Sequence, residues 1–514
     1  MRILLVNPTT PDTFWGLKNA VKFIARKASL PPLGLLTVAA MLPREWGKRL
    51  VDMNVRKLRD ADITWADYVF VTGMIIQRES VDQILERCKR LKRPVVAGGP
   101  LFTAAREDYG HVDHLVLNEA ELTLPRFVAD ATAGRPARLY CTDEKADLAQ
   151  TPVPLWDLVR MKDYASWCIQ SSRGCPFDCD FCDVTTLFGR RFRMKSTEQV
   201  LAEMDYIYAC GWRGNLFFVD DNFIGNKETL KRTMLPSIGE WMRAHDYPFS
   251  LFTQVSINLA DDEALMAAMA AAGFVSVFVG IETPSEAGLR ECRKVQNTNR
   301  DLRDSVARIQ KAGMQVQAGF ILGFDSDGPT VFDTLIKFIQ ESGIVLAMVG
   351  LLNAPRGTRL YQRLAGENRL TGAMSGDNMD CAINFLPAMG LEKLLAGYRQ
   401  VVATLYAPRA YSERVLTFLR NYRMPKIAPF RVQAAELAAF FKSMWHIGVI
   451  GHGRRYYWRV IGWTMLRPRY LHLAVTLSIY GYHFRKVIAA MDERIEAMLR
   501  DHAAPGVVLA EAGA

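Results

Sequence analysis

Three cysteines lie close together in one short stretch of the sequence. Cys175, Cys179 and Cys182 form a C-x3-C-x2-C pattern within SSRGCPFDCDFCDV, directly after an apolar run at residues 167–171 that we expect to form a strand. Three thiolates from one short loop can hold three irons of a [4Fe–4S] cluster and leave the fourth iron open to an external ligand. A molecule bound at an open iron can receive an electron directly. The sequence therefore predicts an iron–sulfur centre in this loop.

Two other interpretations of the cysteine pattern remain open, a zinc knuckle and three ordinary buried thiols. Zinc would require a fourth protein ligand, and no histidine lies near the three cysteines in the sequence. The remaining six cysteines show no comparable clustering, and we interpret them as packing residues: Cys88, Cys141, Cys168, Cys210, Cys292 and Cys381. Nine cysteines are an odd number, and MRILLVNP lacks a basic segment followed by a cleavable apolar run, so we expect a reducing, cytoplasmic location.

Apolar runs that we expect to form strands alternate with helix-length segments through the middle of the chain. They lie at residues 167–171, 215–220, 249–255, 275–281, 315–322 and 344–352. Six such strands separated by helices predict an open or partial α/β barrel, which carries its chemistry at the carboxyl ends of the strands. The cysteine loop follows the first of these strands. Acidic residues end two others, with Asp220 and Asp221 in VDDNF and Glu282 in VGIET.

The first 145 residues show a second alternation of strands and helices. Strand candidates lie at residues 2–6, 49–52, 68–71 and 94–99, and a charged helix is expected at residues 80–92. This pattern predicts a doubly wound, Rossmann-like parallel sheet whose ligand crevice lies outside the carboxyl ends of the strands. The segments that we expect on the rim of this crevice are residues 52–54, 73–77, 98–100 and 118–121.

Length and composition fit a globular protein of several domains. The chain has 514 residues, of which 50% are hydrophobic and 23% charged, which excludes a disordered or collagen-like protein. At about 150 residues per domain, this length predicts roughly three domains. We expect an α/β fold with the Rossmann-like domain at residues 1–145, a linker with Pro152 and Pro154 at 146–165, a partial (β/α)6 barrel at 166–375 and a mostly helical domain at 376–514.

The cysteine pattern and its strand context resemble the radical S-adenosylmethionine superfamily, in which an aromatic residue such as Phe181 usually precedes the last cysteine. The resemblance implies that the open iron chelates S-adenosylmethionine. One electron then cleaves this molecule to methionine and a 5′-deoxyadenosyl radical, which removes a hydrogen atom from the substrate. The resemblance places Phe181, Asp220, Asp221 and Glu282 around S-adenosylmethionine, and Gly323 in a segment near the adenine. For Asp221, the alternative that turns simply favour Asp at a strand end remains open.

The N-terminal unit resembles the cobalamin-binding domain of cobalamin-dependent radical enzymes. Many cobalamin proteins supply a histidine to cobalt from a D-x-H-x-x-G motif, whereas the corresponding stretch here reads DMNVRK, with Asn54 in place of the histidine. The resemblance implies that cobalamin binds without a histidine ligand, through backbone and shape contacts on the rim. The residues to which it points are Asn54, Gly73, Met74, Gln77, Gly98, Gly99 and Glu119. A Rossmann-like domain that binds no ligand remains the alternative.

Nearly the whole chain resembles the hopanoid methylase-like branch of these enzymes, through phrases such as LPPLGLLTVAAMLP, VDMNVR, FVDDNFIGN, FVGIETP and ATLYAPRAYSERVLTFL. The resemblance implies that a methyl group passes from methylcobalamin to an unactivated carbon of a small hydrophobic substrate such as a polycyclic isoprenoid. It also implies an electron donor such as flavodoxin or ferredoxin. One open alternative is a non-methylating enzyme with the same cofactors, such as an oxidative cyclase of tetrapyrrole synthesis. The other is a non-catalytic, cluster-bearing scaffold protein.

The positive charge of the chain lies mainly near its C-terminus. The net charge is +10, yet residues 409–486 alone contain 14 Lys and Arg against two acidic residues. The stretch RRYYWR at 454–459 mixes cations with interfacial aromatic residues, and the apolar run at 470–484 is shorter than the roughly 20 residues that a membrane-spanning helix needs. We expect peripheral contact with the inner face of a membrane and no nucleic-acid binding. An amphipathic helix packed on the barrel remains the alternative.

Overall fold

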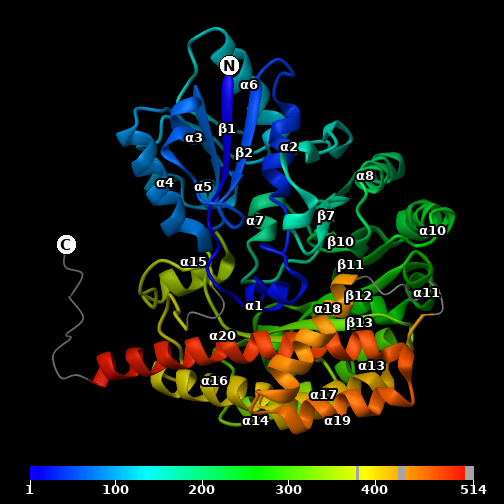
Figure 1. Cartoon of the computed structure of the whole chain (residues 1–514). Helices are drawn as coiled ribbons and strands as arrows, with labels where there is room; N and C mark the ends of the chain where they lie inside the picture. Colours follow the sequence, from blue (N-terminus) through cyan, green and yellow to red (C-terminus); the bar gives the residue numbers. More distant parts are fainter. Residues whose placement is uncertain (378–380, 426–433, 504–514) are drawn as a thin grey trace.

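The computed structural model describes residues 1–377, 381–425 and 434–503. The last eleven residues of the predicted C-terminal domain, 504–514, lie outside this description. Figure 1 shows a sheet of N-terminal strands at the top, a second sheet in the middle and a layer of C-terminal helices below it. The predicted fold class, two parallel α/β units followed by a helical unit, is confirmed.

The N-terminal unit is one parallel sheet with the strand order β2-β1-β3-β4-β5-β6. Its strands are β1 (Arg2–Asn7), β2 (Gly47–Asp52), β3 (Tyr68–Thr72), β4 (Val95–Gly98), β5 (His114–Val116) and β6 (Leu139–Tyr140). Two separate apolar cores cover its faces. One core includes side chains of α3 (Asp60–Trp65), α4 (Arg78–Arg90) and α5 (Pro100–Ala104), and the other includes side chains of α2 (Leu33–Met41) and α6 (Ala120–Thr132). The sheet is therefore doubly wound, and its order reverses between β1 and β3, where such sheets bind ligands.

The second unit is an open barrel of six parallel strands in the order β14-β13-β12-β11-β10-β7. The strands are β7 (Trp167–Ile169), β10 (Gly214–Phe218), β11 (Phe249–Val255), β12 (Phe274–Glu282), β13 (Gln315–Leu322) and β14 (Ala347–Leu351). The helices between them are α8 (Thr197–Ala209), α10 (Leu235–Ala244), α11 (Glu263–Ala271), α12 (Glu286–Glu291), α13 (Leu302–Lys311) and α14 (Val331–Ser342). The predicted partial (β/α)6 barrel is thus confirmed, and each predicted strand coincides with an observed one.

The barrel strands have one fully buried face and one half-buried face. Along β11, Phe249, Leu251, Thr253 and Val255 are buried, whereas the residues between them are half-buried. The buried side chains belong largely to the core that the sheet shares with the surrounding helices, so the half-buried ones point to the inside of the curved sheet. The side chains on this inner face are therefore those that a bound molecule can reach.

The C-terminal helices pack against the barrel and share its apolar core. They are α16 (Leu391–Tyr406), α17 (Pro408–Asn421), α18 (Ala434–Ser443), the π-helix η11 (Met444–Val449), α19 (Arg454–Met465) and α20 (Leu471–Ala503). The shorter helix α15 (Arg359–Gly366) belongs to a separate small core with Cys292 and Phe324. For residues 470–484 the start of α20 supports the alternative of a helix packed on the barrel, because Ala474, Leu477 and Phe484 are fully buried in the core shared with the barrel. Among the residues that the structure describes, no helix combines the length and apolar character needed to cross a bilayer.

The chain segment between β1 and α2 leaves the N-terminal sheet and packs among the other two units. It contains the short helices α1 (Lys18–Val21) and η1 (Lys22–Ile24), which lie between the two sheets and the C-terminal helices in Figure 1. The Phe14 ring stacks on Phe484 of α20, with ring centroids 4.0 Å apart. The backbone carbonyl of Phe14 lies 3.1 Å from His483 Nε2. This segment therefore ties the N-terminal part of the chain to the last helix.

Candidate active site

The three cysteines lie on the loop between β8 (Ser172–Arg173) and α7 (Val184–Phe188). Burial raises the pKa of all three thiols, that of Cys182 to about 12, although backbone N–H groups of Phe177 and Val184 donate to Cys175 and Cys182 and act in the opposite direction. Side-chain amides also approach the sulfurs, since Asn222 Nδ2 lies 4.0 Å from the sulfur of Cys175. The loop thus surrounds its sulfurs with donors that favour a thiolate.

A buried ion pair faces the cysteine loop. Glu282, the last residue of β12, accepts a hydrogen bond of 2.6 Å from Lys294 Nζ. Burial lowers the pKa of Lys294, but the charges of Glu282 and of the Cys179 thiol outweigh this effect and raise it overall. All three cysteines lie within electrostatic range of the same ammonium. Lys294 therefore brings a fixed positive charge to the place where thiolates and a cluster would gather negative charge.

The backbone at the end of β12 is shaped to hold this ion pair. Glu282 has a φ of 64°, a left-handed conformation that non-glycine residues seldom adopt, and the pairing of β12 with β13 shifts register between Gly280 and Glu282. A Cβ at position 280 would lie 2.3 Å from Glu282 Oε1 and 2.7 Å from Lys294 Nζ. A side chain at position 280 would therefore collide with the ion pair. The strained backbone of Glu282 is typical of a functional position.

Gln296 adds a second amide to the site. Its Nε2 lies 3.8 Å from the sulfur of Cys179, while its Oε1 is buried and has no hydrogen-bond partner among the described residues. A buried acceptor without a partner is costly unless a ligand supplies a donor. Gln296 thus leaves an acceptor beside Cys179 that suits the amino group of S-adenosylmethionine.

Asp220 and Asp221 bind the residues that directly precede the cysteine loop. Asp220 is fully buried and accepts hydrogen bonds from the backbone N–H and hydroxyl of Ser171 and from the N–H of Ser172. Asp221 accepts a hydrogen bond of 3.0 Å from the N–H of Gly174. Burial raises the pKa of both carboxyls to about 6. The predicted contact of these residues with S-adenosylmethionine stays a prediction, and their hydrogen bonds favour a role in positioning the loop.

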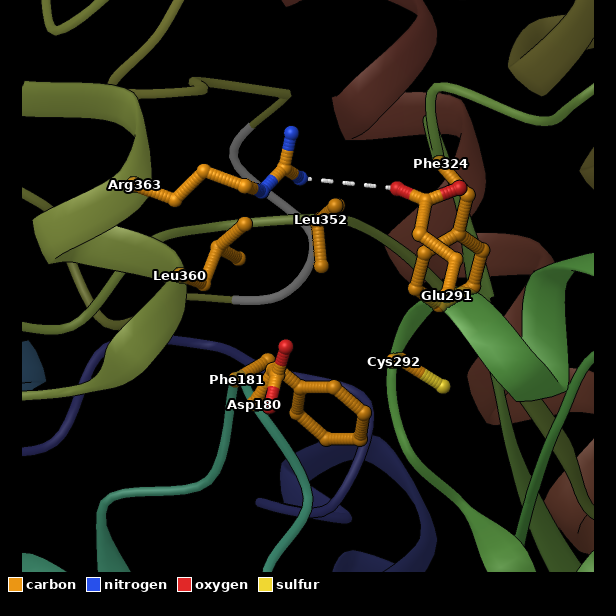
Figure 2. Close-up of a pocket in the computed structure, with 8 residues that line it drawn as sticks. All are labelled: Asp180, Phe181, Glu291, Cys292, Phe324, Leu352, Leu360 and Arg363. Carbon is orange, nitrogen blue, oxygen red and sulfur yellow. Dashed lines mark ion pairs between the residues drawn. The ribbon is translucent and has the colours of Figure 1, made fainter. Parts of the chain in front are cut away.

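The outer side of the loop borders the small pocket drawn in Figure 2. The Phe181 ring lies beside Cys292 there, and an ion pair of 3.5 Å joins Arg363 to Glu291. Backbone hydrogen bonds connect Asp180 to Cys292 and to Leu360, so this part of the loop is fastened to the barrel. Gly323 lies at the end of β13 with its N–H bonded to Asp327. The predicted contacts of Phe181 and Gly323 with the cofactor stay predictions.

A buried cluster of four charged residues, called here the interdomain clamp, joins the cysteine loop to the N-terminal unit. Arg173 and Arg193 are cross-strand neighbours in β8 and β9 (Arg193–Met194), at the two ends of the segment that holds the cysteines. Arg193 binds Glu119 at 2.7 Å, and Arg173 binds Glu121 at 2.8 Å and Glu119 at 3.3 Å. Both glutamates lie at the start of α6. The carboxylate of Glu119 is therefore engaged in the clamp, which favours a positioning role over its predicted contact with cobalamin.

The set of donors fits an iron–sulfur cluster better than a single metal ion. Among the described residues, no three His, Cys, Asp or Glu are arranged to hold one ion, and zinc would require a fourth protein ligand beside the three cysteines. A cluster takes one thiolate per iron and does not require the three sulfurs to meet at one point. Cys175, Cys179 and Cys182 would hold such a cluster, and Glu282, Lys294 and Gln296 would face its ligand.

The N-terminal crevice offers backbone and amide groups at the carboxyl ends of β1, β3 and β4. Gln77 Nε2 donates to the carbonyl of Pro8, and Asn54 accepts from the N–H of Thr10, so these two side chains hold the loop after β1. Met74 is exposed beside them, which suits contact with a flat ligand. Gly73 and the pair Gly98 and Gly99 lie at the ends of β3 and β4. These groups fit a cofactor held by shape, and position 54 itself carries an amide in place of an imidazole.

Aromatic side chains line the inner face of the barrel. The rings of Phe217 and Phe252 are stacked, with centroids 4.5 Å apart and an interplanar angle of 2°. Trp15 packs edge-on against Phe278 at 5.4 Å and donates from Nε1 to the sulfur of Met348 at 2.8 Å. We call these five half-buried residues the aromatic wall. No pattern in the sequence indicates this wall, because it combines residues of separate strands with the N-terminal segment.

A first prediction concerns Lys294, whose ammonium lies near all three thiols. Replacement of Lys294 by Gln is expected to lower the reduction potential of the reconstituted cluster by on the order of 100 mV, because a nearby cation stabilises the more negative, reduced form. A redox titration followed by electron paramagnetic resonance measures this shift. Lys337→Gln, on the exposed face of α14, is the matched control and should leave the potential unchanged. Equal potentials in Lys294→Gln and the parent protein would contradict the assignment.

Three family models match the chain. A "Radical SAM superfamily" model matches residues 169–339, which hold the cysteine loop and nearly all of the barrel. A "B12 binding domain" model matches residues 21–128 of the N-terminal unit. A third model, "Domain of unknown function (DUF4070)", matches residues 358–497 and thus most of the C-terminal helices.

The chain is similar over most of its length to two curated proteins and to a solved structure. The chain is 38% identical to an uncharacterized methyltransferase of Synechocystis sp., over 98% of this chain and 95% of that protein. It is 33% identical to the hopanoid C-2 methylase of Rhodopseudomonas palustris, over 89% of this chain and 88% of that protein. The structure of the cobalamin-dependent S-adenosylmethionine radical enzyme OxsB, with aqua-cobalamin and S-adenosylmethionine bound, superposes with a TM-score of 0.60 at 13% identity, covering 98% of this chain and 81% of that one.

Proposed function

The chain belongs to the cobalamin-dependent radical S-adenosylmethionine enzymes, and from this premise we propose that it methylates an unactivated carbon of a small hydrophobic molecule such as a polycyclic isoprenoid. Its cofactors are a [4Fe–4S] cluster, S-adenosylmethionine and cobalamin, which together supply hydrogen abstraction and a transferable methyl group. Because the family consists of radical enzymes, the scaffold alternative is wrong. The identity of the substrate is the part that we propose.

The aromatic wall carries the proposal for a hydrophobic substrate. Phe217, Phe252 and Phe278 present half-buried rings to the inside of the barrel, and Trp15 closes on them from the N-terminal segment. Rings in such an arrangement offer a large apolar surface and hold a bound molecule through area and shape. A flat or polycyclic hydrocarbon skeleton suits this wall, whereas a highly charged substrate would find few partners on it. The similarity to the hopanoid C-2 methylase supports the same class.

The residues of the site then take separate roles. We assign Cys175, Cys179 and Cys182 to the cluster, and Glu282 and Gln296 to the polar groups of S-adenosylmethionine, since a carboxylate and an amide oxygen both accept hydrogen bonds from an ammonium. The rim around Gly73 and Gly98 is assigned to cobalamin. No side chain acts as a nucleophile in this proposal, because the protein binds, orients and shields the reacting groups from water.

The test is the set of products formed under anaerobic conditions. A methyltransferase of this kind is expected to form both 5′-deoxyadenosine and S-adenosylhomocysteine, because one molecule of S-adenosylmethionine provides the radical and a second provides the methyl group. Purified protein reconstituted with iron, sulfide and cobalamin would be assayed with an isoprenoid lipid extract, and both products and the methylated lipid measured by mass spectrometry. Formation of 5′-deoxyadenosine alone would instead support the alternative of a non-methylating enzyme such as a cyclase.

The proposal includes a partner and a location. A one-electron donor such as flavodoxin or ferredoxin is needed because the cluster must be reduced before each cleavage of S-adenosylmethionine. We propose that the protein works in the cytoplasm, at the inner face of the membrane, where a lipid-like substrate is concentrated. Lipid analysis would compare a deletion strain with its parent and with the complemented deletion strain. The methylated species that disappears on deletion would identify the substrate.

A further inference from the structure

An exposed apolar stripe runs along α18 and η11. Leu437, Phe441, Trp445 and Val449 follow one another at intervals of four residues, and their side chains are 50%, 59%, 58% and 46% exposed. Ile450 continues the stripe with 59% of its side chain exposed. Large apolar residues exposed singly are ordinary, but four at regular intervals along a helix, with Ile450 directly after its end, mark an interaction surface.

The stripe is held in place by the rest of the molecule. The opposite face of the same helices is buried, with Ala439 and Ile447 in the core shared with the barrel. Trp458 of α19 lies next to the stripe, where its Nε1 donates to the carbonyl of Gly448 at 2.9 Å, and it is itself 42% exposed. The stripe is therefore the outer face of a well-anchored helix, with a second indole at its side.

Positive charge predominates around the stripe, although Glu436 directly precedes it. Residues 437–491 contain eight Lys and Arg and no Asp or Glu. Arg454 and Arg455 begin α19, directly after the stripe, and both are exposed. Arg467 and Arg469 are exposed at the other end of that helix. Cations bind anionic headgroups, Trp rings lie at the membrane interface, and apolar side chains enter the outer acyl region. The stripe, its two Trp residues and the nearby cations therefore match the surface of an anionic bilayer.

We propose that this stripe, Leu437 to Ile450 with Trp458, docks the protein on the surface of an anionic phospholipid bilayer. The proposed function gives the docking its purpose, because the helices that present the stripe contact the N-terminal segment, which supplies Trp15 to the aromatic wall. Lys442 Nζ donates to the carbonyl of Phe23 at 3.2 Å, and the Phe23 and His446 rings are in edge contact at 5.8 Å. A lipid-like substrate taken from the bilayer would thus reach the protein near the segment that contains Trp15.

Flotation with vesicles tests the docking. Full-length protein is mixed at low salt with vesicles of phosphatidylcholine alone or of phosphatidylcholine with phosphatidylglycerol, and the bound fraction is measured after centrifugation. We expect binding to the anionic vesicles that falls with salt, and a loss of about tenfold or more in Phe441→Glu, because a charge is placed where an apolar ring should enter the lipid. Leu386→Glu is the matched control, since Leu386 is a similarly exposed apolar residue outside the stripe. Arg454→Gln with Arg455→Gln should weaken binding to anionic vesicles and reduce its salt dependence.

Several outcomes would overturn the proposal. Absence of flotation, equal binding to neutral and anionic vesicles, or equal binding of Phe441→Glu and Leu386→Glu would each contradict it. A dimer that Phe441→Glu converts to a monomer, without any vesicle binding, would assign the stripe to a second copy of the chain. The assay is independent of turnover. If the protein floats as expected but forms no methylated product from detergent-solubilised lipid, the proposed function is contradicted and the docking proposal is supported.

Discussion

Replacement of Cys179 by Ala is expected to abolish the visible absorbance of the reconstituted cluster and the cleavage of S-adenosylmethionine together. Cys179 lies at the centre of the site, where its sulfur faces Gln296 Nε2 and lies within electrostatic range of Lys294. With only two thiolates left, the protein can bind two irons of the cluster instead of three, and the arrangement of three bound irons and one open iron is lost. Cleavage of S-adenosylmethionine should fall below detection, since no other group of the site provides an electron.

Two other cysteines are the controls for Cys179→Ala. Cys210 is exposed at the end of α8, far along the chain from the loop, and Cys210→Ala should keep both the absorbance and the cleavage. Cys292 is a stricter control, because it is buried and lies within electrostatic range of Cys179. Iron and sulfide analysis of the three variants side by side decides the matter. Loss of iron in Cys292→Ala as large as in Cys179→Ala would mean that the ligand set is wrong.

Glu119→Ala is expected to cause a large loss of stability. The variant leaves Arg193 and part of Arg173 without their partner at a place where both side chains are only 11% exposed. Breaking a buried pair in this way costs about 3–5 kcal/mol, because an uncompensated charge remains in the protein. The midpoint of urea unfolding, followed by circular dichroism, measures the loss. The iron content after reconstitution should fall as well, since Arg173 begins the cysteine loop.

The control for Glu119→Ala is Glu107→Ala, at an exposed position of the same unit. A surface substitution of this kind should change the stability by no more than about 0.5 kcal/mol. If both variants unfolded at the same urea concentration, the clamp would have no part in joining the two units. Unchanged iron content in a clearly destabilised Glu119→Ala would separate the stability of the clamp from its effect on the loop.

The sequence predicts the architecture well because both sheets are parallel and buried. The segments of β11 and β13 are rich in apolar residues and bounded by turns, and the predicted strands 249–255 and 315–322 agree with the observed ones to the residue. The strands β5 and β6 were not predicted. They have three and two residues, too few for any periodic pattern, and they form only because the sheet beside them supplies hydrogen-bond partners.

The site was predictable only where its residues lie close together in the sequence. The spacing of the three cysteines and the acidic end of β12 carry a chemical signal within a few residues. Lys294, Gln296 and the interdomain clamp carry none, because each acts on a partner brought near by folding, as when Arg193 reaches Glu119 from 74 residues away. The sequence left two alternatives open for residues 470–484, membrane contact and a helix packed on the barrel, because an apolar run does not show which surface covers it; one face of this run lies in the core.

The path of the N-terminal segment affects how such an enzyme can be recombined. Residues that precede α2 in the chain supply Trp15 to the aromatic wall and Phe14 to the stack on Phe484. A chimaera that takes its first 145 residues from a relative would therefore exchange part of the substrate's surroundings together with the cofactor module. Selectivity would then follow the donor of that module in part, even though the barrel came entirely from the host.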